Sequence, residues 1–375
     1  MSRFFMRSGL LRIVGLAACG LSGLLAMPAP AQAPTSGTTS MTAATGAGSA
    51  PMPTASSPSV EQPTATEVIQ PPRIKHQVLP EYPHQEETKR NGGEGWVQLE
   101  FMVDPNGKPY EIAVTDSTGN KTLEQAAIDS LQQWTFEPGS VNGKAVESST
   151  EILFKFHNPN VIQISSPTFR AAFEQLMAAI QAGNRAAADS AMKALDIDTL
   201  YEDAYVGIAK YNYATKWGDE WQQLEGLRRA TATGALPDAE RRSLMLARLQ
   251  LQLKLRLYAE ALSDWDWLKK PGMGHSLEAR IQPVMDRVEK IRTENGHYDI
   301  QAAMPEGHWG LHLFKRHFHV AVTDGSISQV KLRCGTRFLS LDFDPNLQYD
   351  VSGKYGDCHL ELLGTPGARF ILTQS

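Results

Sequence analysis

Four histidines gather near the start of the C-terminal part of the chain, and imidazole nitrogens are ligands for zinc and copper. They are His308, His312, His317 and His319. The last two lie two residues apart, so a strand would carry both on one side. No cysteine or carboxylate stands nearby at a ligand spacing. We therefore predict no metal or other cofactor, and keep a periplasmic metal-binding protein or enzyme using these histidines as an alternative.

A second cluster that could do chemistry is an acidic run between two predicted helices. It consists of Asp196, Asp198, Glu202 and Asp203. Paired carboxylates can act as general acid and base. Acidic side chains are also favoured at helix N-termini, where they interact with the helix dipole. We expect a solvated capping region here, not a catalytic pair.

The usual signatures of nucleophilic and phosphate chemistry are missing from the sequence. It contains no Gly-x-Ser-x-Gly and no phosphate-binding glycine loop. A net charge of −5 over 375 residues gives no basic footprint for nucleic acid. The sequence therefore predicts a binding protein that is not an enzyme and has no nucleic-acid partner.

The N-terminus indicates export. Arg3, Arg7 and Arg12 precede an apolar stretch, and small residues around Ala31 suit a signal peptidase. We predict a cleaved signal peptide over residues 1–31 and a periplasmic location.

Two other outcomes stay open for this N-terminal segment. Residues 9–27 would be an uncleaved inner-membrane span, although the apolar run is short for one. Alternatively, Cys19 would carry a lipid, because the residues before it resemble a bacterial lipid-attachment motif.

After removal of the signal peptide two cysteines remain, Cys334 and Cys358. An even pair in an exported protein favours a disulfide. The next segment, 32–72, consists largely of Ala, Thr, Ser and Pro. Such a composition buries too little apolar surface to offset the ordering entropy, so we predict a disordered linker.

Residues 73–158 predict a small α+β domain with a three-stranded antiparallel sheet and helices on one face. Apolar residues alternate from Val97 to Val103, a turn signal follows at Asp104–Gly107, and alternation resumes to Val114. A helix carrying Leu123, Ala127, Leu131 and Trp134 on one face comes next, capped by Asn120 or Thr122. The last strand ends at Phe156, and an earlier short helix is expected over 82–90.

The remaining chain predicts two further domains. Residues 165–295 show helical periodicity in three paired segments, with breaks at Gly183-Asn184, Trp217-Gly218 and around Leu257-Tyr258. They resemble degenerate tetratricopeptide-type repeats, and we expect an α-helical hairpin array. Residues 300–375 alternate in short runs separated by turns, which favours a small β-sandwich or barrel containing the disulfide.

Residues 82–156 resemble the C-terminal domain of the TonB family, the energy transducers of Gram-negative envelopes. The matching features follow the family order: Tyr82-Pro83, Gly92 and Gly95 before a strand, Asp104–Gly107, Ser117-Thr118-Gly119, Trp134–Pro138, Gly143–Val146 and Ile152–Phe156. The resemblance covers about a fifth of the chain.

The resemblance implies a mode of binding. Family members pair their exposed last strand with an extended segment of an outer-membrane receptor, which is β-strand addition. Carried over to this sequence, the partner-binding residues are Tyr82, Pro83, Ser148, Ser149, Thr150, Glu151, Ile152, Leu153, Phe154, Lys155 and Phe156. Ile152, Phe154 and Phe156 would anchor the strand, and the charged residues between them would leave the other side polar.

Two departures from the family pattern concern force transmission. The N-terminus looks cleavable, and the linker is short and uncharged. We therefore expect a periplasmic TonB-family protein that binds envelope or receptor proteins, with a groove of the helical array for a second, peptide partner. An inner-membrane-anchored energy transducer using residues 9–27 as its span is the alternative.

Overall fold

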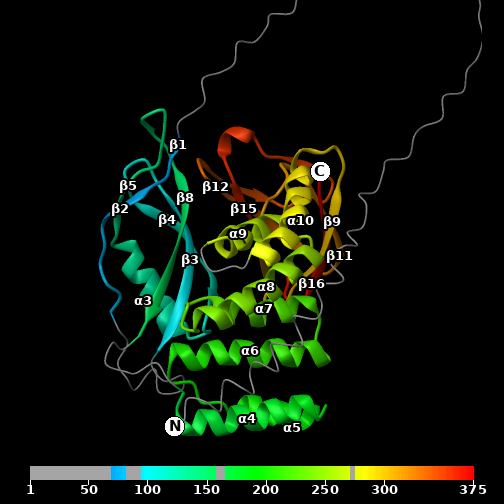
Figure 1. Ribbon diagram of the computed structural model, residues 1–375. Coiled ribbons are helices and arrows are strands. Elements are labelled where there is room, and N and C mark those ends of the chain that lie inside the picture. The colour runs from blue at the N-terminus through cyan, green and yellow to red at the C-terminus, as the bar shows by residue number, and fades with distance from the viewer. Residues whose placement is uncertain (1–68, 82–93, 158–164, 271–274) are drawn as a thin grey trace, which may run out of the picture.

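The computed structural model describes residues 69–81, 94–157, 165–270 and 275–375. They form three parts that lie against one another in Figure 1. We call them the α+β domain (69–157), the helical region (165–293) and the β sandwich (298–375). The predicted signal peptide, the linker up to residue 68 and the short helix over 82–90 lie outside the described residues.

The α+β domain is built on an antiparallel sheet with the strand order β4-β3-β8. Its strands are β3 (Gly95–Val103), β4 (Pro109–Ser117) and β8 (Ser148–Phe156), and helix α3 (Lys121–Gln132) covers one face. The core between them consists of alternate residues of β3 and one stripe along α3, each at most 5% exposed. These are Val97, Leu99, Phe101, Val103, Leu123, Ala127, Leu131 and Trp134.

Local chemistry fixes the hairpin and the start of the helix. The Asp104 carboxylate accepts two backbone N–H groups of the turn at 2.8 Å. Gly107 has a φ of 80°, and a Cβ there would fall 2.0 Å from the Phe136 carbonyl oxygen, so only glycine fits. Asn120 caps α3 by accepting the N–H of Thr122 at 3.0 Å. The predicted turn and cap are confirmed.

Short strands extend the domain toward its N-terminal segment. They are β1 (Ile69–Gln70), β2 (Arg73–His76), β5 (Thr135–Glu137), β6 (Ser140–Val141) and β7 (Lys144–Ala145). β2 pairs with β5, and β1 pairs with β6. Because β1 falls inside the segment predicted to be a linker, the ordered chain begins earlier than residue 73. The pairing with β6 supplies the backbone hydrogen bonds, which composition does not reveal.

The helical region is a series of antiparallel helix pairs followed by one more helix. Its helices are α4 (Pro167–Gln181), α5 (Arg185–Lys193), α6 (Leu200–Trp217), α7 (Glu220–Thr231), α8 (Asp238–Lys254), α9 (Tyr258–Leu268) and α10 (His275–Thr293). The chain turns at Gly183, at Gly218 and at Leu255–Leu257, where the sequence predicted breaks. Their assignment to the tetratricopeptide class stays a prediction.

Helices α6 and α7 approach each other closely because both carry a glycine at the crossing. A Cβ on Gly207 would lie 2.4 Å from the Ala230 nitrogen, and one on Gly226 would lie 2.5 Å from the Tyr211 nitrogen. Contacts this short with backbone atoms exclude any side chain. The two glycines therefore fix the closest helix pair of the region.

The β sandwich has two four-stranded sheets, with the orders β10-β15-β12-β13 and β14-β11-β16-β9. Its strands are β9 (Tyr298–Met304), β10 (His308–His312), β11 (His317–Asp324), β12 (Ile327–Cys334), β13 (Arg337–Asp342), β14 (Tyr349–Asp350), β15 (Cys358–Gly364) and β16 (Ala368–Gln374). Cys334 and Cys358 lie opposite each other on β12 and β15 and form a disulfide.

The core of the sandwich continues into the helical region. The Tyr258 ring at the start of α9 lies 4.9 Å from that of Tyr298 and 5.4 Å from that of Phe314, centroid to centroid. On α7, Trp221 meets Trp309 at 6.0 Å. The predicted boundary near residue 300 is thus a change of secondary structure, across which the hydrophobic core continues.

The second face of the sheet β4-β3-β8 is covered as well, which corrects the expectation of helices on one face and an open polar side. Trp96 and Met102 project from this face of β3 and are 1% and 0% exposed. The helical region and the sandwich pack against it (Figure 1). The alternation of apolar and polar residues along β3 predicted a polar face here, because Gln98 and Glu100 lie on the same face as Trp96 and Met102. The sheet is the middle layer of the molecule.

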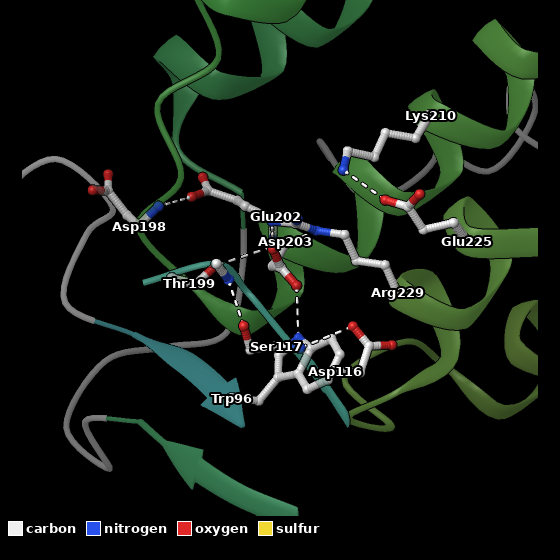
Figure 2. Close-up of polar contacts among 11 residues, drawn as sticks. Trp96, Asp116, Ser117, Asp198, Thr199, Glu202, Asp203, Lys210, Glu225 and Arg229 are labelled. Carbon is white, nitrogen blue, oxygen red and sulfur yellow. Dashed lines mark hydrogen bonds and ion pairs between the residues drawn. The ribbon is translucent and has the colours of Figure 1, made fainter. Parts of the chain in front are cut away.

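A buried carboxylate joins the sheet to the helical region (Figure 2). Asp203, in the first turn of α6, accepts the indole N–H of Trp96 at 2.9 Å and the Nε–H of Arg229 at 2.9 Å. Asp203 is 3% exposed. Nearby on β4, burial raises the pKa of Asp116, while Arg228 and Arg229 act in the lowering direction. Asp203 and Arg229 are thus paired within this interface.

The neighbouring Glu202 is wholly buried and holds the loop before α6 in place. Its carboxylate accepts the N–H of Ser166 and the N–H of Asp198, both at 2.7 Å. The sequence analysis predicted a solvated capping region here. For Glu202 and Asp203 that prediction is wrong, because both are buried. Their donors come from distant segments, so the acidic run itself gives no sign of burial.

A β-bulge in β4 makes the contact with the sandwich. Glu111 sits at the bulge with a φ of 48°, and its carbonyl oxygen accepts the Nε–H of Arg333 at 3.3 Å. Arg333 is 2% exposed, and its Nη1 lies 2.7 Å from Glu361. The Glu111 carboxylate pairs with Lys331 at 3.2 Å. One irregular residue of β4 thus meets two cations of β12.

We expect Asp203→Asn to lower the free energy of unfolding by about 3 kcal/mol, because it leaves the Arg229 guanidinium buried without its counter-charge. Asp238→Asn is the matched control: Asp238 also pairs with an arginine, Arg241 at 3.5 Å, but its side chain is 81% exposed. The control should cost about 0.5 kcal/mol or less. Urea unfolding followed by circular dichroism measures both, and equal costs would contradict the role given to Asp203.

Candidate partner-binding edge

The structure places the predicted partner-binding residues of the last strand together on β8, which pairs antiparallel with β3 from Gly95↔Phe156 to Val103↔Ser148. Phe154 and Phe156 are buried in the core under α3, and Ile152 packs beside them. Tyr82 and Pro83 lie outside the described residues. These three apolar residues pack in the core of the domain, and their part in partner binding stays a prediction.

The other residues of β8 differ in exposure. Ser148 is buried, Ser149, Thr150 and Leu153 are half-buried, and Glu151 and Lys155 are exposed. These last two belong to the face of the sheet that carries Trp96 and Glu100, since directly opposite residues share a face. The strand therefore keeps two charged side chains at the surface.

The outer edge of β8 has the geometry for strand addition. Among the described residues, β3 is the only strand that pairs with β8. In an antiparallel strand, alternate residues direct their N–H and C=O groups away from the neighbour. Such an edge is a template for a further strand. Within the described part of the chain, both faces of the sheet are covered and no second strand is paired with β8.

The two ends of the edge touch other parts of the chain. At the start, the Glu147 carboxylate accepts the Tyr110 hydroxyl at 2.7 Å and the Phe338 N–H at 3.4 Å, and pairs with Arg337 at 3.4 Å. Burial and Glu147 raise the pKa of Tyr110. At the other end, the Lys155 ammonium donates to the Thr233 carbonyl at 2.6 Å. The sandwich and the helical region thus delimit the edge.

The four histidines named from the sequence lie on two strands of different sheets: His308 and His312 on β10, and His317 and His319 together on β11, as expected. His317 lies 3.3 Å from Asp350, and His319 bonds to the Pro345 carbonyl oxygen at 3.0 Å. His308 begins β10 and is exposed. Within the described residues, no group of three or more His, Cys, Asp or Glu side chains could hold a metal ion.

His312 lies where the sandwich, the helical region and the α+β domain meet, beside ionisable side chains from all three parts. Its ring lies 4.9 Å from that of His359, whose Nδ1 is 2.5 Å from Glu100 on β3. The His312 N–H donates to Glu260 of α9 at 3.0 Å. Burial acts to lower the pKa of His312, but the carboxylates of Glu260, Glu100 and Glu151 together raise it. Sequence reasoning missed His359 and Glu100, since no spacing links them.

The helical region offers a hollow of about 530 Å³ between α5, α6 and α7. Arg185, Lys193 and Lys210 bring positive charge to it, and Asp189 and Glu225 bring negative charge. Asp189 accepts the Tyr213 hydroxyl at 2.5 Å. A hollow lined by both charges on a helical array suits a peptide more than a small apolar ligand.

A search of the described residues for membrane-spanning helices finds none that is both long and apolar enough. The segment 9–27, considered above as a possible span, lies outside them.

Comparison with known proteins identifies the α+β domain. Residues 78–157 match the family model described as Gram-negative bacterial TonB protein C-terminal. Protein tonB2 of Pseudomonas aeruginosa is 36% identical over 81 residues, which are 22% of this chain and 29% of that protein. Protein TonB of Vibrio cholerae is 30% identical over 89 residues, 24% of this chain and 36% of that protein.

A solved structure is similar to the same part of the chain. It is the solution NMR structure of the Pseudomonas aeruginosa TonB CTD, with 24% sequence identity and a TM-score of 0.21, covering 24% of this chain and 90% of that one. The chain spans about a third of the length of the curated relatives it matches. Residues 78–157, about a fifth of the chain, are thus similar to the C-terminal domain of TonB proteins, in the family model and in these relatives.

Proposed function

We propose that this chain is an exported periplasmic protein that binds outer-membrane receptors or other envelope proteins by strand addition, in TonB-dependent transport. The observation that carries the proposal is β8, a nine-residue strand that pairs only with β3 among the described residues, at the edge of a sheet whose two faces are both covered. The similarity of residues 78–157 to TonB C-terminal domains supplies the class of partner.

The chemistry of β8 supports binding through the backbone. An added strand gains affinity from main-chain hydrogen bonds, and alternate side chains give it specificity. Burial of Phe154 and Phe156 holds β8 against the core. The edge is therefore already shaped when the partner arrives, which reduces the entropy lost on binding.

The helical region is proposed to serve a second partner. Helical arrays present extended surfaces for peptides. On this array, the hollow between α5, α6 and α7 is the candidate site for such a peptide. No catalytic residues are proposed anywhere in the chain.

Strand addition is tested by Leu153→Pro, with Leu153→Ala as the matched control. Proline removes a backbone N–H and stiffens the strand, so capture of outer-membrane receptor peptides should be lost. Alanine keeps the N–H and removes only the half-buried side chain, so it should retain most of the binding. Pull-down measures capture, and circular dichroism checks that the helices remain folded. Unchanged capture by the proline variant would reject strand addition.

Export by a cleaved signal peptide predicts that the mature protein begins at Gln32, after cleavage behind Ala31. Mass spectrometry of the intact protein purified from the periplasm measures this mass. A mass that still includes residues 9–27, or a lipid on Cys19, would contradict cleavage after Ala31 and indicate a membrane-anchored protein.

A further inference from the structure

The edge strand carries two uncompensated charges at a fixed spacing. Glu151 and Lys155 are exposed and lie four residues apart on the same face of β8. Neither forms an ion pair with any described residue. Glu151 accepts a hydrogen bond from the neutral Gln98 amide at 3.1 Å, and Lys155 donates to the Thr233 carbonyl. Neutral partners leave the formal charges in place.

The surroundings of Glu151 do not change this conclusion. Glu151 contributes to the raised pKa of His312, whose ring nitrogen Nδ1 lies 3.8 Å from the Glu260 carboxylate. At the other charge, the contact of Lys155 is with the connection between α7 and α8. A strand laid along the edge would therefore meet the Glu151 carboxylate, and would compete with the Thr233 carbonyl for the Lys155 ammonium.

Between the two charges lies Leu153, half-buried on the same face. Side chains directly opposite each other in adjacent strands interact, with opposite charges favoured and like charges disfavoured. A strand next to β8 would place one residue opposite Glu151, one opposite Leu153 and one opposite Lys155. The favoured types are a cation, an apolar residue and an anion, at positions i, i+2 and i+4.

We propose that β8 selects extended partner segments that carry opposite charges four residues apart with an apolar residue midway. This inference rests on strand addition at β8, the function proposed above. The order of the charges along the partner depends on its direction. A parallel strand carries the cation first, and an antiparallel strand carries the anion first.

Position is restricted at both ends of the edge. The contacts of Glu147 with Arg337 and Phe338 lie just before β8. The contact of Lys155 with Thr233 lies at the second-last residue of the strand. The stretch between these contacts is Ser148–Phe154, where β3 is the strand paired with β8 among the described residues. A segment of about this length has little room to shift its charges out of register.

The test uses three fluorescent nine-residue peptides of alternating Thr and Val. The first has Lys four residues before Glu, the second has Glu four residues before Lys, and the third is neutral, all with Val midway. Fluorescence anisotropy with the full chain should show one charged peptide binding about tenfold more tightly than the other. The double variant Glu151→Lys with Lys155→Glu should reverse the preference.

A charge exchange elsewhere in the same domain is the matched control. Lys75→Glu with Glu137→Lys exchanges two exposed charges on β2 and β5 and should leave the preference unchanged. Equal affinity for the two charged peptides would overturn the charge selection. Strand addition would still be supported in that case, because the peptides bind. Binding of none of the three peptides would overturn strand addition, and the charge selection with it.

Discussion

The structure depends on the burial of the second face of the sheet β4-β3-β8. Trp96 and Met102 need an apolar cover on that face, while Glu100 and the bulged Glu111 need counter-charges. The helical region contributes Asp203 of α6, which accepts the indole N–H of Trp96 and pairs with Arg229 of α7. The sandwich supplies His359, Lys331 and Arg333. Removing one partner of a buried ion pair strongly destabilises a protein, because the other charge stays buried without compensation. These contacts therefore favour a single arrangement of the three parts.

Covering both faces leaves the edges of the sheet for recognition. A free TonB-like domain would offer a face and an edge, whereas here the described face opposite α3 is an internal interface. β8 is held by its own core on one side and delimited at its ends by Arg337 and Thr233. Recognition is then a matter of backbone groups and a few alternate side chains along nine residues.

Local features were predictable from the sequence, and distant pairings were not. The turn at Asp104–Gly107 and the cap at Asn120 follow from side chains that act within a few residues. The burial of Glu202 and Asp203 was missed because Ser166, Arg229 and Trp96 are far away in the chain. Strand β9 was missed although its residues alternate, since two alanines weaken the apolar signal.

Residue-resolved amide hydrogen exchange on the full chain tests the state of the edge most directly. An open edge predicts alternation along Ser148–Phe156: amides bonded to β3 exchange slowly, and those directed outward exchange fast. The amides of β3, which has strands on both sides, should all exchange slowly. Uniformly slow exchange along β8 would contradict this, because it would mean that another part of the chain already occupies the edge.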